Sequence, residues 1–264
     1  MNKQLRGAFI ALVTGWLSGC ALKPTGPVNH FTLEVDLPAQ FRFVGVAYYH
    51  PARYQMCKLP QRRGKRPERK VIIADYKAEA GRVSYDLPLT QTIEGCPTTL
   101  SRVSFDIWAK WGATDYDIGG DRASIYFSHP VESENVAGMP DSGVQELPLG
   151  QCMWFFRVLG PDRLIRKLLE CRTLDEMGQR QKVQAGGVVQ RALLPGKTVR
   201  LVLTLTDKEE PAIADTWIAV PGGWKRCMGR GIDDLWGGCA SNNKEFKTIT
   251  LPDGRLCEVY PTCH

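Results

Sequence analysis

The sequence lacks the short patterns that mark the common catalytic and nucleotide-binding sites. G-x-S-x-G, H-E-x-x-H, G-x-G-x-x-G and the Walker phosphate loop are all absent from the chain. Histidine is scarce, with 4 among 264 residues, and none stands beside a serine or cysteine motif that would make it a catalytic base. We therefore expect a protein that is not an enzyme and that needs no cofactor.

Closely spaced cysteine pairs are absent as well. None of the 9 cysteines belongs to a C-x-x-C pair, and their long, unequal spacings argue against a zinc site, so we expect no metal. The first, Cys20, follows an apolar leader, and setting it aside leaves eight that can pair completely in an oxidising compartment. The sequence leaves their connectivity open. The cysteines expected in disulfides are Cys57, Cys96, Cys152, Cys171, Cys227, Cys239, Cys257 and Cys263.

The first 19 residues have the organisation of a secretory signal peptide. Lys3 and Arg6 make its start positive, and the apolar stretch 7–17 has the length of the central region of such a peptide. This stretch is too short to cross a bilayer comfortably, since a spanning helix needs about 20 apolar residues. No second apolar segment of that length follows. We therefore expect an exported protein whose body does not span the membrane.

A lipid-attachment motif ends the leader. Residues 17–20, Leu-Ser-Gly-Cys, resemble the bacterial lipobox, in which cleavage falls just before the cysteine and a diacylglycerol is attached to its sulfur. The resemblance implies a lipoprotein signal peptide over 1–19 and a lipid on Cys20, followed by a short tether over 20–29. Alanine at position 21, in place of aspartate, implies the periplasmic side of the outer membrane. The alternative is an ordinary cleaved signal peptide with an incidental cysteine.

The pattern after residue 30 is typical of a mainly β fold. Short segments rich in Val, Ile, Phe, Tyr and Thr alternate with Gly, Pro and Asp. We expect an antiparallel β-sandwich-like domain over 30–130, a linker or long crossover over 131–150, and a disulfide-stapled β-rich domain over 151–264. The strands expected in the first domain are His30–Val35, Phe41–Tyr49, Lys70–Tyr76, Arg82–Leu87, Arg102–Trp111 and Arg122–Phe127.

Residues 152–172 fit two structures. Their charged residues recur at the spacing of a helix face. A β-hairpin that turns at Pro161-Asp162 would instead place Cys152 directly opposite Cys171, at a Cα distance that a disulfide tolerates. We favour the hairpin with a Cys152–Cys171 bridge, and with a turn wider than two residues because proline cannot adopt the backbone of a tight primed turn.

The rest of the second domain mixes one regular strand with irregular chain. Apolar side chains alternate along Thr198–Thr206, which predicts a strand. From Gly222 the sequence is rich in glycine and leaves little room for regular structure, so the last four cysteines would act as staples. Leu251–Gly254 reads as a tight turn before the last short strand.

Acidic residues between the fifth and sixth strands partly match a calcium-binding loop. Asp115, Asp117 and Asp121 stand at positions 1, 3 and 7 of such a loop, with a glycine at position 6. The acid at position 5 and the glutamate at position 12 are missing, and Tyr126 stands at position 12. We interpret this segment as a polar connection between two strands.

Two features are candidates for contact with a partner. Trp224 and Trp236 lie in the glycine-rich part, where tryptophans serve either as local core or as interface anchors. Loss of the leader would lower the formal net charge from +6 to +4, which favours anionic lipid or an acidic protein surface and not nucleic acid. A basic run is typical of a solvated loop or of such an electrostatic contact, and it includes Arg62, Arg63, Lys65 and Arg66.

Several segments spread over the chain carry a family resemblance. They are the lipobox, YQMCKLP (54–60), YDLPLTQTIEGCPTTL (85–100) and the terminal GGWKRC, LPDG and CEVYPTC. Together they resemble periplasmic immunity lipoproteins encoded beside type VI secretion phospholipase effectors. The resemblance implies a protein that binds a secreted lipase or phospholipase and blocks its active site or its access to lipid. The alternative is a structural or assembly lipoprotein of the cell envelope or secretion apparatus, which shares the lipid anchor and the β-rich body.

Overall fold

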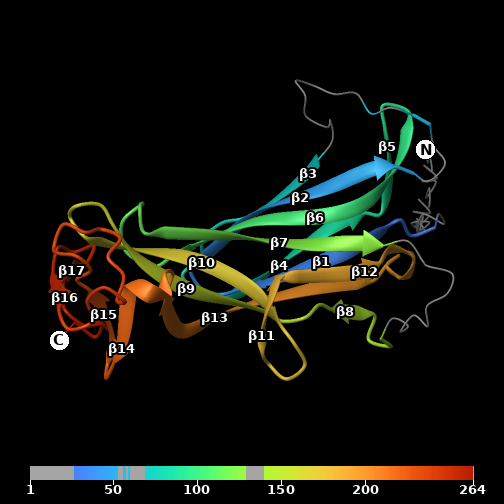
Figure 1. The fold of residues 1–264 in the computed structure, drawn as a ribbon. Helices are drawn as coiled ribbons and strands as arrows, with labels where there is room; N and C mark the ends of the chain where they lie inside the picture. The colour runs from blue at the N-terminus through green and yellow to red at the C-terminus, as the bar shows by residue number, and fades with distance from the viewer. Residues whose placement is uncertain (1–26, 53–55, 58, 60–68, 129–139, 264) are drawn as a thin grey trace, which may run out of the picture.

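The computed structural model describes residues 27–52, 56–57, 59, 69–128 and 140–263, which form a mainly β structure, as expected (Figure 1). Two short 3-10 turns, Arg191–Leu193 and Ala214–Thr216, interrupt the strands. Within the described residues no helix is long and apolar enough to cross a membrane. The expected leader and the lipid-bearing Cys20 lie outside the described residues.

The strands form three sheets. The first has the order β18-β17-β10-β9-β13-β1-β4, with β8 beside β13 and β11 beside β10, and the second has the order β12-β7-β6-β2-β3, with β5 beside β6. A small third sheet has the order β14-β15-β16, with β19 beside β15. The first sheet comprises β1 (His30–Leu37), β4 (Gly81–Pro88), β8 (Val144–Glu146), β9 (Gly150–Leu159), β10 (Leu164–Leu174), β11 (Arg180–Gln184), β13 (Thr198–Pro211), β17 (Ile249–Thr250) and β18 (Leu256–Cys257). The second comprises β2 (Phe41–Pro51), β3 (Arg69–Ala74), β5 (Thr90–Ile93), β6 (Cys96–Lys110), β7 (Ile118–Ser128) and β12 (Gly186–Gln190), and the third comprises β14 (Trp217–Val220), β15 (Gly223–Cys227), β16 (Phe246–Lys247) and β19 (Tyr260–Pro261).

The six strands expected before residue 130 are confirmed as β1, β2, β3, β4, β6 and β7, and they pair with one another in antiparallel fashion. Burial alternates along β1 and β2, as the period of a strand with one buried face requires. The first and second sheets share one core, in which the ring centroids of Phe31 and Phe127 lie 5.4 Å apart and those of Phe43 and Tyr85 lie 6.0 Å apart. Burying a phenylalanine side chain contributes roughly 2–3 kcal/mol, so this core is a main source of stability.

Strand pairing crosses the segment expected to be a linker. β1 pairs in parallel with β13, and β7 pairs in parallel with β12. The described part of the expected linker, 140–150, contains β8, which also pairs with β13. The segment 131–150 therefore does not separate two independent sheets, and strands from both sides of it build the same sandwich.

The chain passes from the first sheet to the second between β11 and β12. The N–H of Ala185 donates to the carbonyl of Cys171 at 3.2 Å, and its carbonyl accepts from the N–H of Ser124 at 3.1 Å. The next residue, Gly186, has a φ of 124°, and a Cβ there would lie 1.9 Å from the carbonyl oxygen of Ser124. Only glycine fits this crossing, which closes one side of the sandwich.

The expected hairpin at 152–171 is confirmed as β9 and β10. Cys152 stands directly opposite Cys171 in the register, and the two are joined by a disulfide with their Cα atoms 3.9 Å apart. The connection is the four residues 160–163, in which the N–H of Arg163 donates to the carbonyl of Gly160 at 3.2 Å. The expected strand at Thr198–Thr206 is likewise confirmed within β13.

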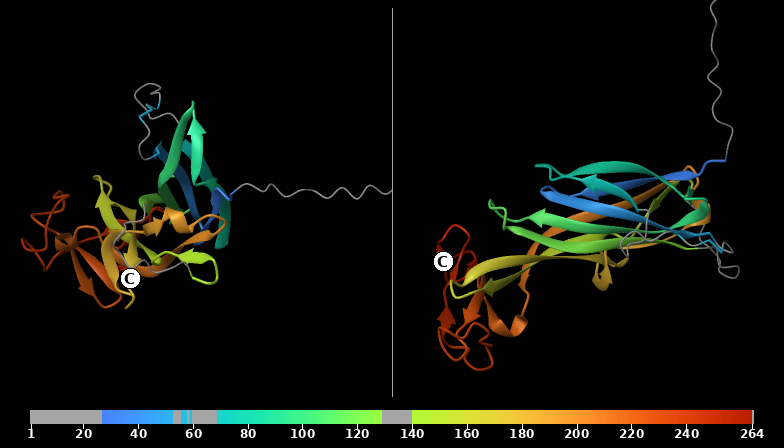
Figure 2. Two further views of the ribbon diagram at one scale, coloured as in Figure 1. Left: turned by 90° about the vertical axis from the view of Figure 1, so that its right-hand side faces the viewer. Right: turned by 90° about the horizontal axis from the view of Figure 1, so that it is seen from above.

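The molecule is long in the direction of its strands (Figures 1 and 2). The first described residues and β5 lie at one end, where the side chain of Asn29 donates to the carbonyl of Thr90 at 2.8 Å. The third sheet and the C-terminus lie at the opposite end. We call these the N-terminal end and the C-terminal end of the molecule.

All eight cysteines expected in disulfides are paired, and each pair is formed by neighbours in the order of the sequence. The bridges are Cys57–Cys96, Cys152–Cys171, Cys227–Cys239 and Cys257–Cys263. Four disulfides indicate an oxidising compartment outside the cytoplasm.

Removing a disulfide should destabilise the protein according to the length of the loop that it closes, because the bridge restricts the unfolded chain. We expect replacement of both Cys152 and Cys171 by alanine to lower the free energy of unfolding by about 3 kcal/mol in guanidinium denaturation. The matched variant removes the Cys257–Cys263 bridge, whose cysteines are 6 positions apart, whereas Cys152 and Cys171 are 19 apart. Its loss should therefore lower the free energy of unfolding by about 1 kcal/mol less. Equal losses would show that loop length does not control the effect.

Candidate protein-binding surface

The third sheet, its loops and the short strands β17 and β18 of the first sheet form a module, residues 212–263, at the end of the β9–β10 hairpin. Its core contains Phe156 of β9, whose ring centroid lies 4.9 Å from that of Trp217 and 4.7 Å from that of Tyr260. The Tyr260 hydroxyl donates to the Glu209 carboxylate at 2.7 Å, and burial together with that carboxylate raises the pKa of Tyr260. Glu209 also pairs with Lys167 of β10. These contacts attach the C-terminal module to the end of the first sheet.

The most organised part of this module is the loop that the Cys227–Cys239 disulfide closes, residues 227–239, which we call the stapled loop. The Arg226 side chain precedes it and is only 5% exposed. Its guanidinium donates to the carbonyl oxygens of Thr216, Gly237 and Leu235 at 2.8, 2.7 and 3.0 Å, and also to that of Cys227. Burial lowers the pKa of Arg226, but an arginine stays charged. A buried cation thus holds both ends of the stapled loop through its carbonyl groups.

A second buried cation holds the middle of the stapled loop. The Lys247 ammonium donates to the carbonyl of Asp234 at 2.5 Å, and burial, with Arg226 nearby, lowers the pKa of Lys247. The Asp234 carboxylate in turn accepts from the backbone N–H groups of Arg230 at 3.0 Å and Trp236 at 3.2 Å. These N–H groups hold the pKa of the Asp234 carboxyl below its usual range, while partial burial acts in the opposite direction. Backbone and side chains therefore fix one conformation of the loop.

The two arms of the stapled loop touch where both carry glycine. A Cβ on Gly229 would lie 2.3 Å from the Cα of Gly237, and one on Gly237 would lie 2.6 Å from the Cα of Gly229. Because real Cβ atoms do not approach so closely, any larger residue would push the arms apart. This close approach explains why both of these positions in the glycine-rich stretch carry glycine.

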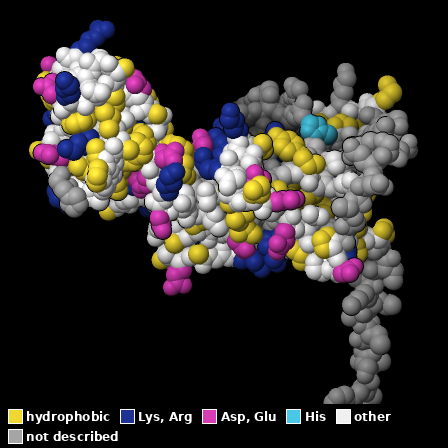
Figure 3. Space-filling model, turned by 60° about the horizontal axis from the view of Figure 1, so that its bottom comes forward, with side chains coloured by type: hydrophobic (Ala, Val, Ile, Leu, Met, Phe, Trp, Pro, Cys, Tyr) yellow, Lys and Arg dark blue, Asp and Glu magenta, His cyan; other side chains and the backbone are white. Residues whose placement is uncertain are grey.

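Apolar side chains project from this rigid loop into solvent. Trp236 is 75% exposed, Ile232 50% and Leu235 43%. Figure 3 shows apolar side chains on the surface of the C-terminal module, which is the lobe at the left. Large rigid aromatic side chains on a fixed backbone make effective anchors in protein interfaces, because little conformational entropy is lost when they bind. The stapled loop is therefore the candidate binding surface.

The structure separates the two tryptophans that the sequence placed together. Trp224, on β15, is partly buried and packs against the core of the C-terminal module, with its ring centroid 6.2 Å from that of Phe156. Trp236, in contrast, is exposed. The basic residues Arg62, Arg63, Lys65 and Arg66 lie outside the described residues, so their role stays a prediction.

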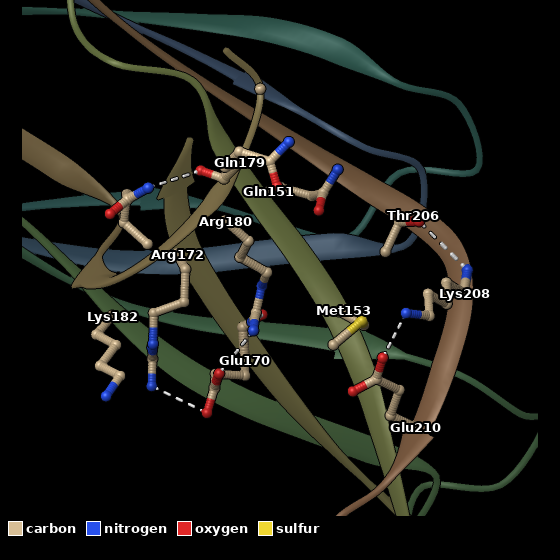
Figure 4. Close-up of a pocket in the computed structure, with 12 residues that line it drawn as sticks. Gln151, Met153, Glu170, Arg172, Gln179, Arg180, Lys182, Thr206, Lys208 and Glu210 are labelled. Atoms are coloured by element: carbon tan, nitrogen blue, oxygen red, sulfur yellow. Dashed lines mark hydrogen bonds and ion pairs between the residues drawn. The ribbon is translucent and has the colours of Figure 1, made fainter. Parts of the chain in front are cut away.

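A second surface feature is a cavity of about 590 Å³ beside β11 (Figure 4). The Glu170 carboxylate in it pairs with Arg172 at 3.0 Å and with Arg180 at 2.9 Å, and Lys208 pairs with Glu210 at 2.5 Å. Most of its charged side chains are thus engaged in ion pairs, although cations outnumber carboxylates in the lining by four to two. No pattern in the sequence predicts this cavity, because its lining comes from the separate strands β9, β10, β11 and β13 and the loop before β11.

The acidic residues that partly match a calcium loop do not face a common centre. Asp117 is buried, and its carboxylate accepts from the N–H of Thr114 at 3.0 Å. The Asp121 carboxylate accepts from the N–H of Cys171 at 2.7 Å and pairs with Arg172 at 3.0 Å. Among the residues that the structure describes, no group of three or more His, Cys, Asp or Glu side chains is placed to hold a metal ion.

Comparison of the chain with protein-family models, with curated proteins and with solved structures finds no match.

Arg226→Met should loosen the stapled loop, because it leaves several carbonyl groups in this buried site without donors. Loss of such charge-assisted hydrogen bonds costs roughly 3 kcal/mol. We therefore expect amide hydrogen exchange in residues 228–238 to become roughly 100-fold faster. As a control, Arg122→Met removes an exposed arginine paired with Asp106 at 3.2 Å and should leave that exchange unchanged. Normal exchange in Arg226→Met would mean that the disulfide and the contacts of Lys247 and Asp234 hold the loop without Arg226.

Acid should also loosen the stapled loop through Asp234. Its pKa is lowered in the folded protein, so the carboxylate stabilises the loop fully above its ordinary pKa, and this contribution disappears as the pH falls through the lowered value. We expect the amide proton signals of Arg230 and Trp236 to shift between about pH 5 and pH 2 in NMR spectra. In Asp234→Asn the same signals should be insensitive to pH, and persistence of the shift would assign it to another group.

Proposed function

We propose that this chain is an envelope immunity protein. The leader directs export, and Cys20 carries the lipid that holds the chain on the periplasmic side of the outer membrane. The disulfide-bonded body binds a phospholipase or lipase toxin delivered by type VI secretion and blocks its active site or its access to lipid. The chain performs no catalysis in this role.

The observation that carries this proposal is a rigid apolar loop on a body joined by four disulfides. The disulfides suit a protein that must stay folded in an oxidising compartment. The stapled loop exposes Trp236 on a backbone that needs no rearrangement before binding. A protein with these properties can inhibit a toxin by occlusion alone, and the family resemblance supplies the class of toxin.

Lipid attachment explains how a passive binder can protect a membrane. An anchored protein is confined to the layer where a lipase acts, which raises its local concentration without any additional contact. The alternative, a structural or assembly lipoprotein, uses the same anchor but requires neither binding to a lipase nor protection from one. A lipase reading frame beside the gene favours immunity, and genes for secretion machinery favour the alternative.

Cells that produce the lipase encoded beside this gene in their periplasm should survive when the full-length chain is co-expressed. In vitro, an equimolar amount of the chain should lower the activity of that lipase roughly tenfold or more if binding is tight. Cys20→Ser should abolish labelling by a fatty acid and weaken protection in cells, yet leave inhibition in solution intact. Absence of any complex between the wild-type chain and the lipase would contradict the proposal.

A further inference from the structure

We propose that the stapled loop is the docking surface and that it inserts Trp236 into an apolar pocket of a protein partner, on the side of the molecule that faces away from the membrane. This inference rests on the proposed function and adds to it the surface that binds and the direction from which the toxin arrives.

The position of the loop relative to the anchor is the first argument. The described chain begins at the N-terminal end, and the C-terminal module lies at the opposite end (Figure 2). β6 alone has 15 residues, which corresponds to a length of about 50 Å. Only residues 21–26 separate Cys20 from the first described residue, and six residues span at most about 20 Å when fully extended. The short connection keeps the N-terminal end near the lipid, so the stapled loop lies at the end of the molecule that can reach farthest into the periplasm.

The composition of the loop is the second argument. Exposed Trp236, Ile232 and Leu235 provide an apolar centre, and the exposed charges of Arg230 and Asp233, which are of opposite sign, lie in the same loop. An apolar centre with a mixed polar rim is typical of protein interfaces. A loop that enters an anionic membrane would instead carry mainly cations beside its apolar residues.

The stiffness of the loop is the third argument. Arg226 and Lys247 hold its carbonyl groups, Asp234 holds two of its N–H groups, and the Cys227–Cys239 bridge closes it. The backbone beneath Trp236 is therefore ordered before binding. A tryptophan presented in this way contributes strongly to affinity, because only its own side chain must be ordered on binding.

Titration calorimetry with the purified lipase encoded beside the gene tests this inference with the mature lipoprotein in detergent. We expect Trp236→Ala to raise the dissociation constant roughly 30-fold or more, the effect of removing a central interface residue. The matched control is Met177→Ala, which removes another exposed apolar side chain from a different loop and should leave the constant unchanged. If Trp236→Ala binds as tightly as the wild type, this inference is wrong while the proposed function stands. If the wild type itself does not bind, the proposed function fails.

Photo-crosslinking in cells identifies the occupant directly. A photoreactive benzoylphenylalanine in place of Trp236 in the full-length chain should crosslink to the lipase toxin when the toxin is present. Crosslinking to phospholipid would show that the loop enters the membrane, and crosslinking to a second copy of the chain would show a dimer contact. Either of these results would overturn the inference. Amide exchange of residues 228–238 in each variant verifies that the loop is still folded.

Discussion

The register of the β9–β10 hairpin is the constraint on which the rest of the molecule depends. At its base, Cys152 and Cys171 stand opposite each other in the core that the two large sheets share. Toward its tip, Phe156 and Ile165 enter the core of the C-terminal module. Because side chains alternate with a period of two, a slip of one residue would turn both sets of apolar residues to the wrong face. The disulfide forbids this slip, so one bridge fixes the sandwich and the module together.

Local patterns were enough to predict most of the long strands, but neither the short strands such as β5, β8 and β11 nor how distant strands pair. The alternation in β1 and β13 is visible in the sequence, yet their parallel pairing joins residues as far apart as Thr32 and Thr198 and leaves no local signal. The hairpin register was predictable because a turn at Pro161-Asp162 places Cys152 and Cys171 opposite each other, at a distance that a disulfide tolerates. The exposure of Trp236 was not, since the sequence places both Trp224 and Trp236 in one glycine-rich stretch. Which of them is buried depends on the pairing of β15 and on the contacts of Arg226.

Polar contacts, and not an apolar core, stabilise the stapled loop. Its glycines supply almost no side-chain surface to bury, so the hydrophobic effect cannot hold it. The buried cations Arg226 and Lys247 take over this role by donating to carbonyl groups that would otherwise lack partners. Burying a cation is costly, but several oriented carbonyl dipoles and the nearby Asp234 compensate for the loss of water. The side chains of the loop that these contacts do not use, above all Trp236, remain exposed.

Under the proposed function, the lipid on Cys20 and the stapled loop are separated along the molecule. The lipid would confine the N-terminal end, and the β-sandwich, whose two large sheets share one core, connects that end to the C-terminal module. The Cys57–Cys96 bridge lies at the N-terminal end, because Cys96 pairs with Ile93 of β5 there. The proposed anchor and the proposed docking loop would therefore act at opposite ends of one body, so that holding the first end leaves Trp236 exposed to a partner.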